Sequence, residues 1–341
     1  MTDIYGLTYD RLRDALSELG EKPSRVDTIF PAVYGQLADS FDGLPLRART
    51  VELLAENFRF GALKCLDVRR SDTADKYLWE LEDGCTVESV LMKHGFGNNV
   101  CVSTQVGCNM GCRFCMSGRL KRRRDLTVSE LVGQVVGIAK LSGEKPGGIS
   151  VMGTGEPLEN LGAVLDFIGI MMYPKGMDIG LKHITLSTCG VVPGIYSLAE
   201  SAYPVNLAIS LHAPYDELRA QLMPIARKYP LDEVMRAARD YSEKLNRRIT
   251  LEYVMLDGVN DSPDCAEKLA ELIGDMNAYV NIIRYNNVDG SGFRCSPHDR
   301  IMSFYDALKK RRVGVTMRRS LGDSIDAACG QLSAGAEKSS T

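Results

Sequence analysis

Three cysteines stand close together in the chain, at Cys108, Cys112 and Cys115. Their C-x3-C-x2-C spacing gathers three thiols on a short segment, and two glycines, one before and one inside it, allow this segment to turn. Three thiolates on a four-iron cluster leave one iron open, and an open iron can bind and reduce a further ligand. The alternative is a structural zinc site, which needs a fourth ligand, and the next cysteine along the chain is Cys189. The spacing therefore favours an iron-sulfur cluster with an exchangeable position.

A glycine-rich turn follows at Gly153-Thr154-Gly155-Glu156-Pro157, after the apolar run GISVM. Such a turn exposes backbone N–H groups, and a carboxylate beside it can accept hydrogen bonds from an amino group. By itself the turn is a common strand-to-helix connection, and a structural role is the preferred interpretation. From the residues alone, ligand binding by Glu156 is the alternative.

The segments that must position these residues alternate apolar runs with amphipathic ones. Amphipathic helices are expected over 127–141 and 232–245, and strands are expected in the runs GGISVMGTGEP, KHITLSTCG, PVNLAISLHA, RITLEYVML, AYVNIIRYN and VGVTMRR. Because parallel strands need crossover connections, this alternation predicts an α/β fold with a parallel sheet. Polar and reactive residues follow the C-terminal ends of these strands, where α/β barrels build their active sites.

The first part of the chain follows a different pattern. Between residues 8 and 60 apolar residues recur at helical spacing and predict two helices, one with Leu12, Leu16 and Leu19 and a later one with Val51, Leu53, Leu54 and Phe58. From 64 to 102 short alternating segments follow, and Asp83-Gly84 suits a hairpin turn. These patterns predict a helical accessory domain over 1–63, a β extension over 64–93, a core domain over 94–324 and a C-terminal segment over 325–341 with a polar tail.

Composition narrows the functional classes. Of the 341 residues 45% are apolar and 25% are charged, which is typical of a globular protein, and no apolar run is long enough to span a bilayer. The N-terminal stretch lacks the basic and apolar regions of a signal peptide, so we expect a cytoplasmic protein without a membrane partner. In a reducing compartment, the ten cysteines of the chain are expected to bind metal, to do redox chemistry or to be buried in the core. The net charge of −3 gives no global sign of a nucleic-acid partner, although the run RLKRRR at 119–124 is locally basic.

Almost the whole chain resembles the RlmN/Cfr family of radical S-adenosylmethionine (SAM) enzymes, which methylate adenosine in RNA. The resemblance rests on the three-cysteine motif, with Phe114 before its last cysteine, and on the segments LMKHGFGNNVCVSTQVGC, GTGEP, HITLSTCG, LAISLHAP and GDSIDAACGQL. It implies a radical SAM partial (β/α)6 barrel with an N-terminal helical accessory domain and a short β extension. It also implies a 4Fe-4S cluster on Cys108, Cys112 and Cys115 and two molecules of S-adenosyl-L-methionine per turnover.

The resemblance also assigns functional residues. It implies that SAM is bound by Gly155, Glu156, Ser187, Ser210, Leu211, His212 and Asn286. It implies that Cys329 and Cys101 are catalytic and that Glu88 accepts a proton. From the residues alone, Glu88 is one more strand carboxylate and Cys101 one more buried cysteine, whereas the small neighbours of Cys329 would let a large substrate approach.

The implied chemistry uses the two extra cysteines in turn. C2 of adenine lies between two ring nitrogens, and it is too electron-poor to displace a methyl group as a nucleophile. By analogy with the family, the Cys329 thiolate first takes a methyl group from one SAM. A 5'-deoxyadenosyl radical from a second SAM then abstracts a hydrogen atom from this S-methyl group, and the carbon radical adds to C2. Glu88 removes the C2 proton, and Cys101 releases the product by forming a transient disulfide with Cys329.

The resemblance implies 23S rRNA and tRNA as substrates and an electron donor such as a flavodoxin or a ferredoxin. Because the base must be unstacked, open RNA is expected as the substrate rather than the mature ribosome. Three alternatives stay open. The enzyme could methylate C8 of the 23S rRNA adenosine, as the Cfr branch does to give antibiotic resistance. It could also be a non-catalytic RNA-binding protein with a structural metal loop, or a radical enzyme that activates a partner by hydrogen abstraction.

Three positions depart from the family pattern, namely Cys189, Ala226 and Arg284. None of them is an implied ligand or catalytic cysteine, so we expect them to alter substrate contacts rather than the reaction type. Cys189 is otherwise expected to be a small buried hydrophobe, as are Cys65, Cys85, Cys265 and Cys295. The basic run at 119–124 would suit contacts with phosphates, and a solvated face is the alternative.

Overall fold

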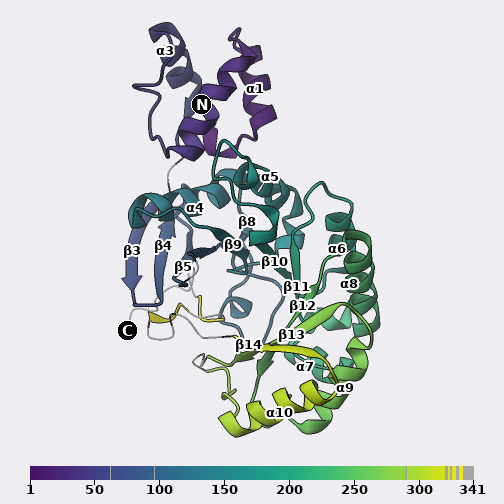
Figure 1. Cartoon of the computed structure of the whole chain (residues 1–341). Coiled ribbons are helices and arrows are strands. Elements are labelled where there is room, and N and C mark those ends of the chain that lie inside the picture. The colour runs from purple at the N-terminus through teal and green to yellow at the C-terminus, as the bar shows by residue number, and fades with distance from the viewer. Residues whose placement is uncertain are drawn as a thin grey trace.

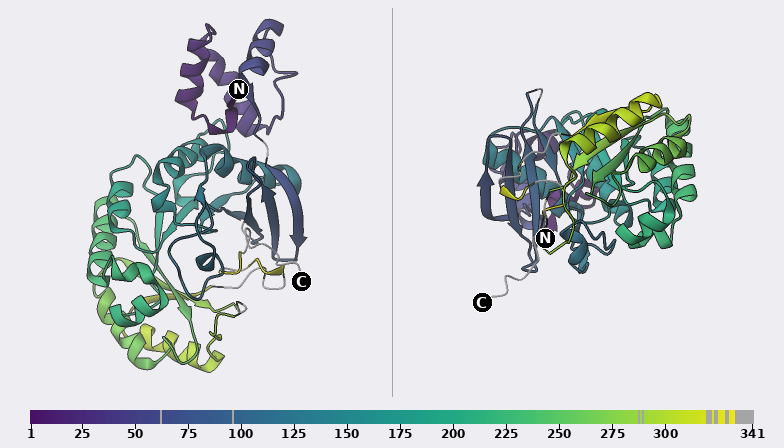
Figure 2. Two further views of the ribbon diagram at one scale, coloured as in Figure 1. Left: turned by 180° about the vertical axis from the view of Figure 1, so that it is seen from behind. Right: turned by 90° about the horizontal axis from the view of Figure 1, so that it is seen from below.

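The computed structural model describes residues 1–61, 63–95, 97–286, 288, 290–318, 322, 325–327 and 330–332. The expected catalytic Cys329 therefore lies outside the described residues. A ten-stranded sheet runs through the main body of the molecule and curves, with helices along its outer side (Figure 1). A group of N-terminal helices stands at one end of this body, as the view from behind also shows (Figure 2).

The parallel part of the sheet follows the order of the sequence, so each strand lies beside the next one along the chain. Its strands are β6 (Asn99–Cys101), β9 (Gly148–Val151), β10 (Ile184–Thr188), β11 (Asn206–Ser210), β12 (Ile249–Met255), β13 (Ala278–Arg284) and β14 (Gly314–Met317). All six predicted strands form, and their parallel pairing is confirmed. Among the described strands the sheet does not close, because β14 and β3 are its two edges. The predicted partial barrel is therefore confirmed.

Helices connect these strands in the crossover manner that parallel pairing requires. They are α4 (Val128–Ser142), α5 (Leu161–Met172), α6 (Val192–Ala199), α7 (Asp216–Leu222), α8 (Leu231–Leu245), α9 (Pro263–Ile273) and α10 (His298–Lys310). The two predicted helices appear as α4 and α8. A capping box starts α4: the Thr127 hydroxyl accepts from Glu130 N, and the Glu130 carboxylate accepts from Thr127 N.

Three antiparallel strands extend the sheet beyond β6. They are β3 (Lys64–Arg70), β4 (Ala74–Glu80) and β5 (Thr86–Met92), and β5 pairs directly with β6. The hairpin predicted at Asp83-Gly84 is confirmed, because it joins β4 to β5 and Gly84 has a positive φ of 76°. The β extension is therefore part of the same sheet as the barrel strands.

The N-terminal residues form the helices that their spacing predicts. They comprise β1 (Thr2–Asp3), α1 (Tyr9–Glu18), α2 (Val26–Phe30), α3 (Ala48–Asn57) and β2 (Phe58–Arg59). Leu12 and Leu16 are buried on one face of α1. The expectation that Phe58 continues the later helix is wrong, because Phe58 is extended and pairs with Thr2 in a small parallel sheet.

Short helical turns link these elements. They are η1 (Ile4–Gly6), η2 (Pro23–Arg25), η3 (Pro31–Gly35), η4 (Ser117–Arg119), η5 (Pro157–Glu159), η6 (Leu181–His183) and η7 (Pro224–Arg227). Two further short strands, β7 (Gln105–Val106) and β8 (Arg124–Asp125), pair with each other in antiparallel fashion. None of the described helices is both long and apolar enough to cross a bilayer.

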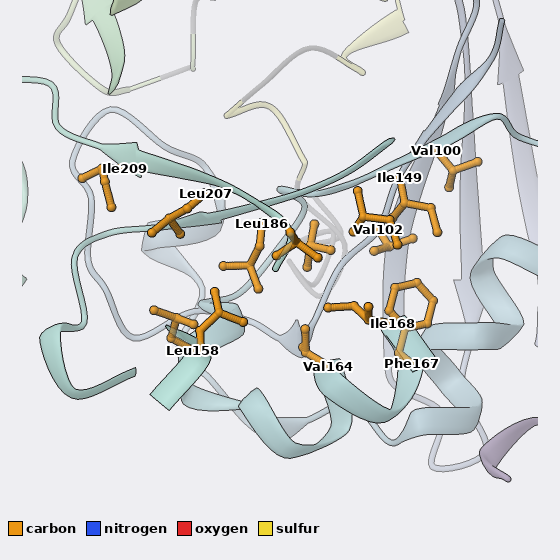
Figure 3. Close-up of a cluster of buried hydrophobic side chains, with 14 of the residues drawn as sticks. Val100, Val102, Ile149, Leu158, Val164, Phe167, Ile168, Leu186, Leu207 and Ile209 are labelled. Carbon is orange, nitrogen blue, oxygen red and sulfur yellow. The ribbon is translucent and has the colours of Figure 1, made fainter. Parts of the chain in front are cut away.

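The core lies between the sheet and its outer helices. Figure 3 shows one part of it, where side chains of β6, β9, β10 and β11 face those of α5. Ile149, Leu186 and Leu207 from the strands and Phe167 and Ile168 from α5 are all fully buried. Burying each such side chain contributes about 1.5–3 kcal/mol. This packing fixes the strand ends from which the site is built.

Candidate active site

A cavity lies at the C-terminal ends of the parallel strands. It contains about 980 Å³ of space, including its open mouth. The three cysteines of the motif line it together with most of the residues expected to bind SAM: Gly155, Glu156, Ser187, Ser210, His212 and Asn286. Side chains from separate strand ends thus meet at one place, as in other α/β barrels.

The three-cysteine loop, here residues 108–115, runs between β7 and η4 and is held by backbone hydrogen bonds. Cys108 N donates to Leu120 O at 2.8 Å. Arg113 N donates to Leu222 O at 3.0 Å, which ties the loop to the end of α7. Gly118 packs so tightly under the loop that a Cβ there would lie 2.5 Å from Cys112 O. The loop is therefore held in shape by backbone contacts with the segments beside it.

The thiols of this loop lie in a place that disfavours negative charge. Burial raises the pKa of Cys108 to about 12 and that of Cys115 to about 11. Thiolates here need a bound cation, and a cluster of iron ions with sulfur ligands supplies one. In the part of the chain that the structure describes, no group of three His, Cys, Asp or Glu side chains is arranged around a single metal ion. A donor set of three sulfurs facing an open cavity fits an iron-sulfur cluster.

The glycine-rich turn after β9 places a buried carboxyl group on the cavity wall. Glu156 is 1% exposed, and its carboxylate accepts hydrogen bonds from Leu158 N at 3.1 Å and Cys189 N at 2.7 Å. Burial raises the pKa of Glu156 to about 7. Gly155 is required beside it, because its φ is +113° and a Cβ would lie 2.6 Å from Thr104 Oγ1. Glu156 can accept a further hydrogen bond from an amino group in the cavity.

The ends of β10 and β11 supply hydroxyl and imidazole groups. Ser187 Oγ lies 3.3 Å from Ser210 Oγ, on neighbouring strands. His212 adopts a φ of +59°, and its Nδ1 accepts a hydrogen bond from Val254 N at 3.1 Å. Burial lowers the pKa of His212 to about 3, so its imidazole is neutral. The ring of Phe114 packs against it edge-on, with centroids 4.8 Å apart. His212 thus links the cysteine loop to the strand ends.

Leu211 differs from the other residues expected to bind SAM. Its side chain is fully buried in the core and does not line the cavity. Its N–H donates to Glu252 O at 3.1 Å. Its carbonyl accepts from Arg219 Nε at 3.3 Å and from Ala213 N at 2.8 Å, so hydrogen bonds within the protein already engage both backbone groups of Leu211.

Glu88 and Cys101 lie outside this cavity, on one face of β4–β6. Cys101 stands directly opposite Val90 in the β5–β6 pairing, and Glu88 is two residues from Val90, so all three point to the same side. Cys101 is 8% exposed and packs with Ala74, Val90, Ala327 and Leu332 in a small apolar cluster. Ala327 and Leu332 belong to the C-terminal segment, so that segment lies against Cys101.

The described parts of the C-terminal segment are anchored at several points. Met116 N, just after the cysteine loop, donates to Gly330 O at 2.8 Å. Ser117 Oγ donates to Leu332 O at 3.0 Å. Lys76 Nζ donates to Asp326 O at 3.0 Å. The segment therefore connects the cysteine loop to the face of β4–β6.

Three residues of the cavity and of the face of β4–β6 were not predicted from the sequence. Lys76 lies 3.1 Å from Glu88, through Nζ and Oε1. Arg219 is fully buried, and its Nη2 donates to Cys189 O at 2.7 Å, which holds the end of β10. Glu252 lines the cavity and accepts from Asn281 Nδ2 at 2.9 Å. For Glu252, the available signal was a charged residue inside the apolar run RITLEYVML. For Lys76, the available signal was its place two residues before Leu78, which puts both side chains on the same face of β4.

The positions that depart from the family pattern are distributed unevenly. Cys189 and Arg284 both line the cavity, whereas Ala226 is buried in η7. The interpretation of Cys189 as a core hydrophobe is wrong, because its Sγ lies 3.9 Å from Cys112 Sγ at the cysteine loop. Cys189 follows the C-terminal end of β10, and this strand end lies beside the cysteine loop, so its side chain faces the cavity. Cys265 is buried as expected, while Cys65, Cys85 and Cys295 are half-buried.

The basic run 119–124 is partly used inside the protein. Arg124 forms ion pairs with Asp83 at 2.7 Å and Glu130 at 2.8 Å. Arg122 pairs with Asp125 at 2.8 Å. Lys121 and Arg123 are exposed. Only part of this run therefore presents its charge to solvent in the way that phosphate contacts need.

Comparison with known proteins adds to this geometry. Residues 102–273 match the model of the radical SAM superfamily. A protein of Geobacillus kaustophilus named "Probable dual-specificity RNA methyltransferase RlmN" is 45% identical over 346 aligned residues, which cover 100% of this chain and 95% of that protein. A protein of the same name from Lachnospira eligens is 42% identical, with 97% and 96% covered.

A solved structure agrees with these relatives. The crystal structure of a radical SAM methyltransferase from Sphaerobacter thermophilus superimposes with a TM-score of 0.93. It is 38% identical, and the match covers 97% of this chain and 99% of that one. Radical SAM enzymes use a 4Fe-4S cluster and SAM, so both cofactors apply here. Fold, cavity and relatives together show that the chain belongs to the RlmN family of radical SAM RNA methyltransferases.

Proposed function

We propose that this protein methylates C2 of an adenosine in 23S rRNA and in tRNA, through an S-methylcysteine at Cys329 and a transient Cys101–Cys329 disulfide. One observation carries the proposal. Described residues on both sides of Cys329 in the sequence contact two separate places: Gly330 accepts from Met116 beside the cysteine loop, and Ala327 packs with Cys101. A segment anchored in this way connects the SAM cavity with the proposed disulfide partner.

The cavity supports the first half of the reaction. We assign the cluster to Cys108, Cys112 and Cys115, and the amino group of SAM to Glu156. Ser187, Ser210, His212 and Asn286 would bind the rest of SAM, and Leu211 would support the two residues beside it from the core. When bound, cluster and SAM supply a methyl group for a thiolate and a carbon radical that abstracts hydrogen. The neutral His212 adds no charge that would repel the sulfonium of SAM.

The chain's own residues carry the later steps. The Cys329 thiolate would take the methyl group of one SAM, so that an S–CH3 bond forms, the bond from the sulfonium to this methyl breaks and S-adenosylhomocysteine leaves. Once the carbon radical supplied by a second SAM has taken one hydrogen atom from this methyl group, the remaining methylene would form a bond to C2 of adenine. Glu88 then takes the C2 proton on its carboxylate. The Cys101 thiolate attacks the Cys329 sulfur, so that an S–S bond forms and the S–CH2 bond breaks. The methylene takes up a proton to become the methyl group, and the one unpaired electron leaves to a one-electron carrier.

The disulfide must be reduced before the next turnover. This step needs two electrons, which thiol–disulfide exchange with a dithiol supplies. The electron donor of the cluster is a separate partner, which we assign to a flavodoxin or a ferredoxin. Cys101 packs among Ala74, Val90 and Ala327 in a small apolar cluster. Burial of this kind keeps small oxidants in solution away from the thiol before it reacts with Cys329. The name of the relatives, dual-specificity RNA methyltransferase, supports more than one RNA substrate.

The experiment is methyl tracing under anaerobic conditions. The reconstituted protein is incubated with methyl-labelled SAM, a reductant and unmodified 23S rRNA fragments or tRNA, and peptides and nucleosides are analysed by mass spectrometry. We expect label on Cys329 before RNA is added and 2-methyladenosine afterwards. Cys65→Ala, which removes a half-buried thiol from edge strand β3, is the matched control and should behave like the parent protein. 8-Methyladenosine would instead assign the C8 reaction, and an unlabelled Cys329 would contradict the proposed intermediate.

A further inference from the structure

Lys76 is a buried lysine on β4 that touches both Glu88 and the C-terminal segment. Its side chain is 6% exposed, and its Nζ lies 3.1 Å from Glu88 Oε1, whose side chain is 7% exposed. The same Nζ donates to Asp326 O at 3.0 Å, across 250 residues of sequence. One ammonium group therefore joins the proposed proton acceptor to the C-terminal segment.

The sheet register explains how this contact arises. Lys76 stands opposite Val90, and Leu78 stands opposite Glu88, so Lys76 and Glu88 form a diagonal pair on one face. Cys101 stands opposite Val90 on the other side and shares that face. The face thus collects an ammonium, a carboxylate and a thiol under the C-terminal segment.

A buried ammonium and a buried carboxylate stabilise each other's charged form, since each alone would lose its charge in a dry environment. Glu88 needs its negative charge to accept a proton. An ammonium has no lone pair, so Lys76 can orient the Glu88 carboxylate but cannot itself accept the C2 proton. Its hydrogen bond to Asp326 O uses a second of its donors, so the two contacts can exist together.

A neighbouring ion pair shows what a purely structural pair looks like here. Lys93 Nζ lies 2.7 Å from Asp75 Oδ1, also between β5 and β4. Asp75 alternates with Lys76 along β4 and so points to the opposite face, and the Lys93 side chain is 36% exposed. The Lys93 ammonium donates to Ser71 O and to Asp75, and among the described residues it makes no hydrogen bond to the C-terminal segment.

We propose that Lys76 is a positioning residue of the methylation reaction, which holds Glu88 as a charged, oriented proton acceptor and fixes the C-terminal segment beside it through Asp326. This inference rests on the proposed function. The step that it serves is the transfer of the C2 proton to the Glu88 carboxylate, which becomes a carboxylic acid while Lys76 remains an ammonium. No electron moves in this step.

The test follows three quantities in one sample: methyl on Cys329 without RNA, covalent RNA–protein adduct on a denaturing gel, and 2-methyladenosine. The variants are Lys76→Met, Lys76→Gln, Lys76→Arg and the matched control Lys93→Met. We expect Lys76→Met to methylate Cys329 at close to the parent level, because Gly330 and Leu332 keep their anchors. Product formation should fall by about tenfold or more and adduct should accumulate, because proton removal is slowed.

Rescue separates positioning from packing. Lys76→Arg restores a cation and should recover part of the product yield, whereas Lys76→Gln folds with a polar side chain but lacks the charge and should accumulate adduct. Lys93→Met should match the parent protein. Should Lys76→Met not fold, Lys76→Gln carries the test.

Three outcomes would overturn this inference. One is release of adduct at the parent rate in folded Lys76→Met or Lys76→Gln. Another is an equal loss in Lys93→Met, which would mean general weakening of the sheet. The third is a parent protein that carries no methyl on Cys329, and this result alone would overturn the proposed function as well.

Discussion

The cavity at the parallel strand ends and the face of β4–β6 are built in different ways. In the cavity, short local motifs place each group: the cysteine loop, the turn at 153–157 and the ends of β10 and β11. On the face of β4–β6, the groups come from distant parts of the chain, as the contact between Lys76 and Asp326 shows. Local motifs thus create a binding site, and long-range docking creates the place where the proposed chemistry ends.

The two regions also differ in how they treat charge. Burial in the cavity lowers the pKa of His212, which is neutral, and raises the pKa of Glu156 to about 7, so the charge of Glu156 depends on a ligand that compensates it. On the face of β4–β6, the charge of Glu88 is balanced by Lys76 within the protein. The cavity therefore depends on its cofactors, whereas the other face is preorganised by the protein itself.

We expect the largest effect from a change that removes the cluster from the cavity, because every later step depends on it. Cys112→Ala should lose the cluster, and product should fall by about a thousandfold or more because all steps depend on it. Iron content and visible absorbance after anaerobic reconstitution measure this. The matched control is Cys189→Ala, whose thiol lies 3.9 Å from that of Cys112. Equal loss of iron in both variants would contradict the assignment of Cys112 over Cys189.

A second variant should disable only the face of β4–β6. Cys101→Ala is expected to keep the cluster, bind SAM and methylate Cys329, yet yield about a thousandth of the product or less, because the adduct cannot be resolved. Iron analysis, SAM binding and product yield are measured side by side. If Cys101→Ala forms 2-methyladenosine at the parent rate, the two regions do not divide the reaction in the way described.

The charge of the cavity predicts a pH dependence of SAM binding. The pKa of Glu156 is raised to about 7, so its carboxyl group is neutral below this pH and charged above it. A carboxylate accepts a hydrogen bond from an amino group more strongly than a carboxylic acid does, so SAM affinity should rise by about tenfold from pH 6 to pH 8. Titration calorimetry at several pH values measures this. Glu156→Gln should bind more weakly with a flat profile, and Glu88→Gln should keep the parent profile; a slope retained in Glu156→Gln would assign the titration to another group.

The smallest expected effect concerns the basic run at 119–124. Arg123→Ala should lower RNA affinity a few-fold and reduce the salt dependence of binding by about one counterion, since Arg123 is exposed. Arg124→Ala should cost about 1 kcal/mol of folding stability with little change in RNA affinity, because its ion pairs with Asp83 and Glu130 are lost. Filter binding at several salt concentrations and thermal unfolding compare the two. Reversed behaviour would place the RNA contact on the other arginine.

The sequence predicts the parts of the molecule that local patterns determine. Apolar alternation located the barrel strands, and the spacing of thiols located the cysteine loop, because both depend on residues close in the chain. Phe58 escaped prediction since its pairing with Thr2 is set by tertiary contacts. The same holds for Cys189 beside Cys112 and for Lys76 beside Glu88, which no short pattern could bring together.

The most direct test of the central claim is peptide and nucleoside mapping of the covalent adduct that Cys101→Ala is expected to form with RNA and methyl-labelled SAM. We predict a labelled methylene that joins the sulfur of Cys329 to C2 of adenine, in a protein that still holds its cluster. A link to C8, a link through another cysteine, or no adduct in a sample with intact cluster and methylated Cys329 would contradict the account.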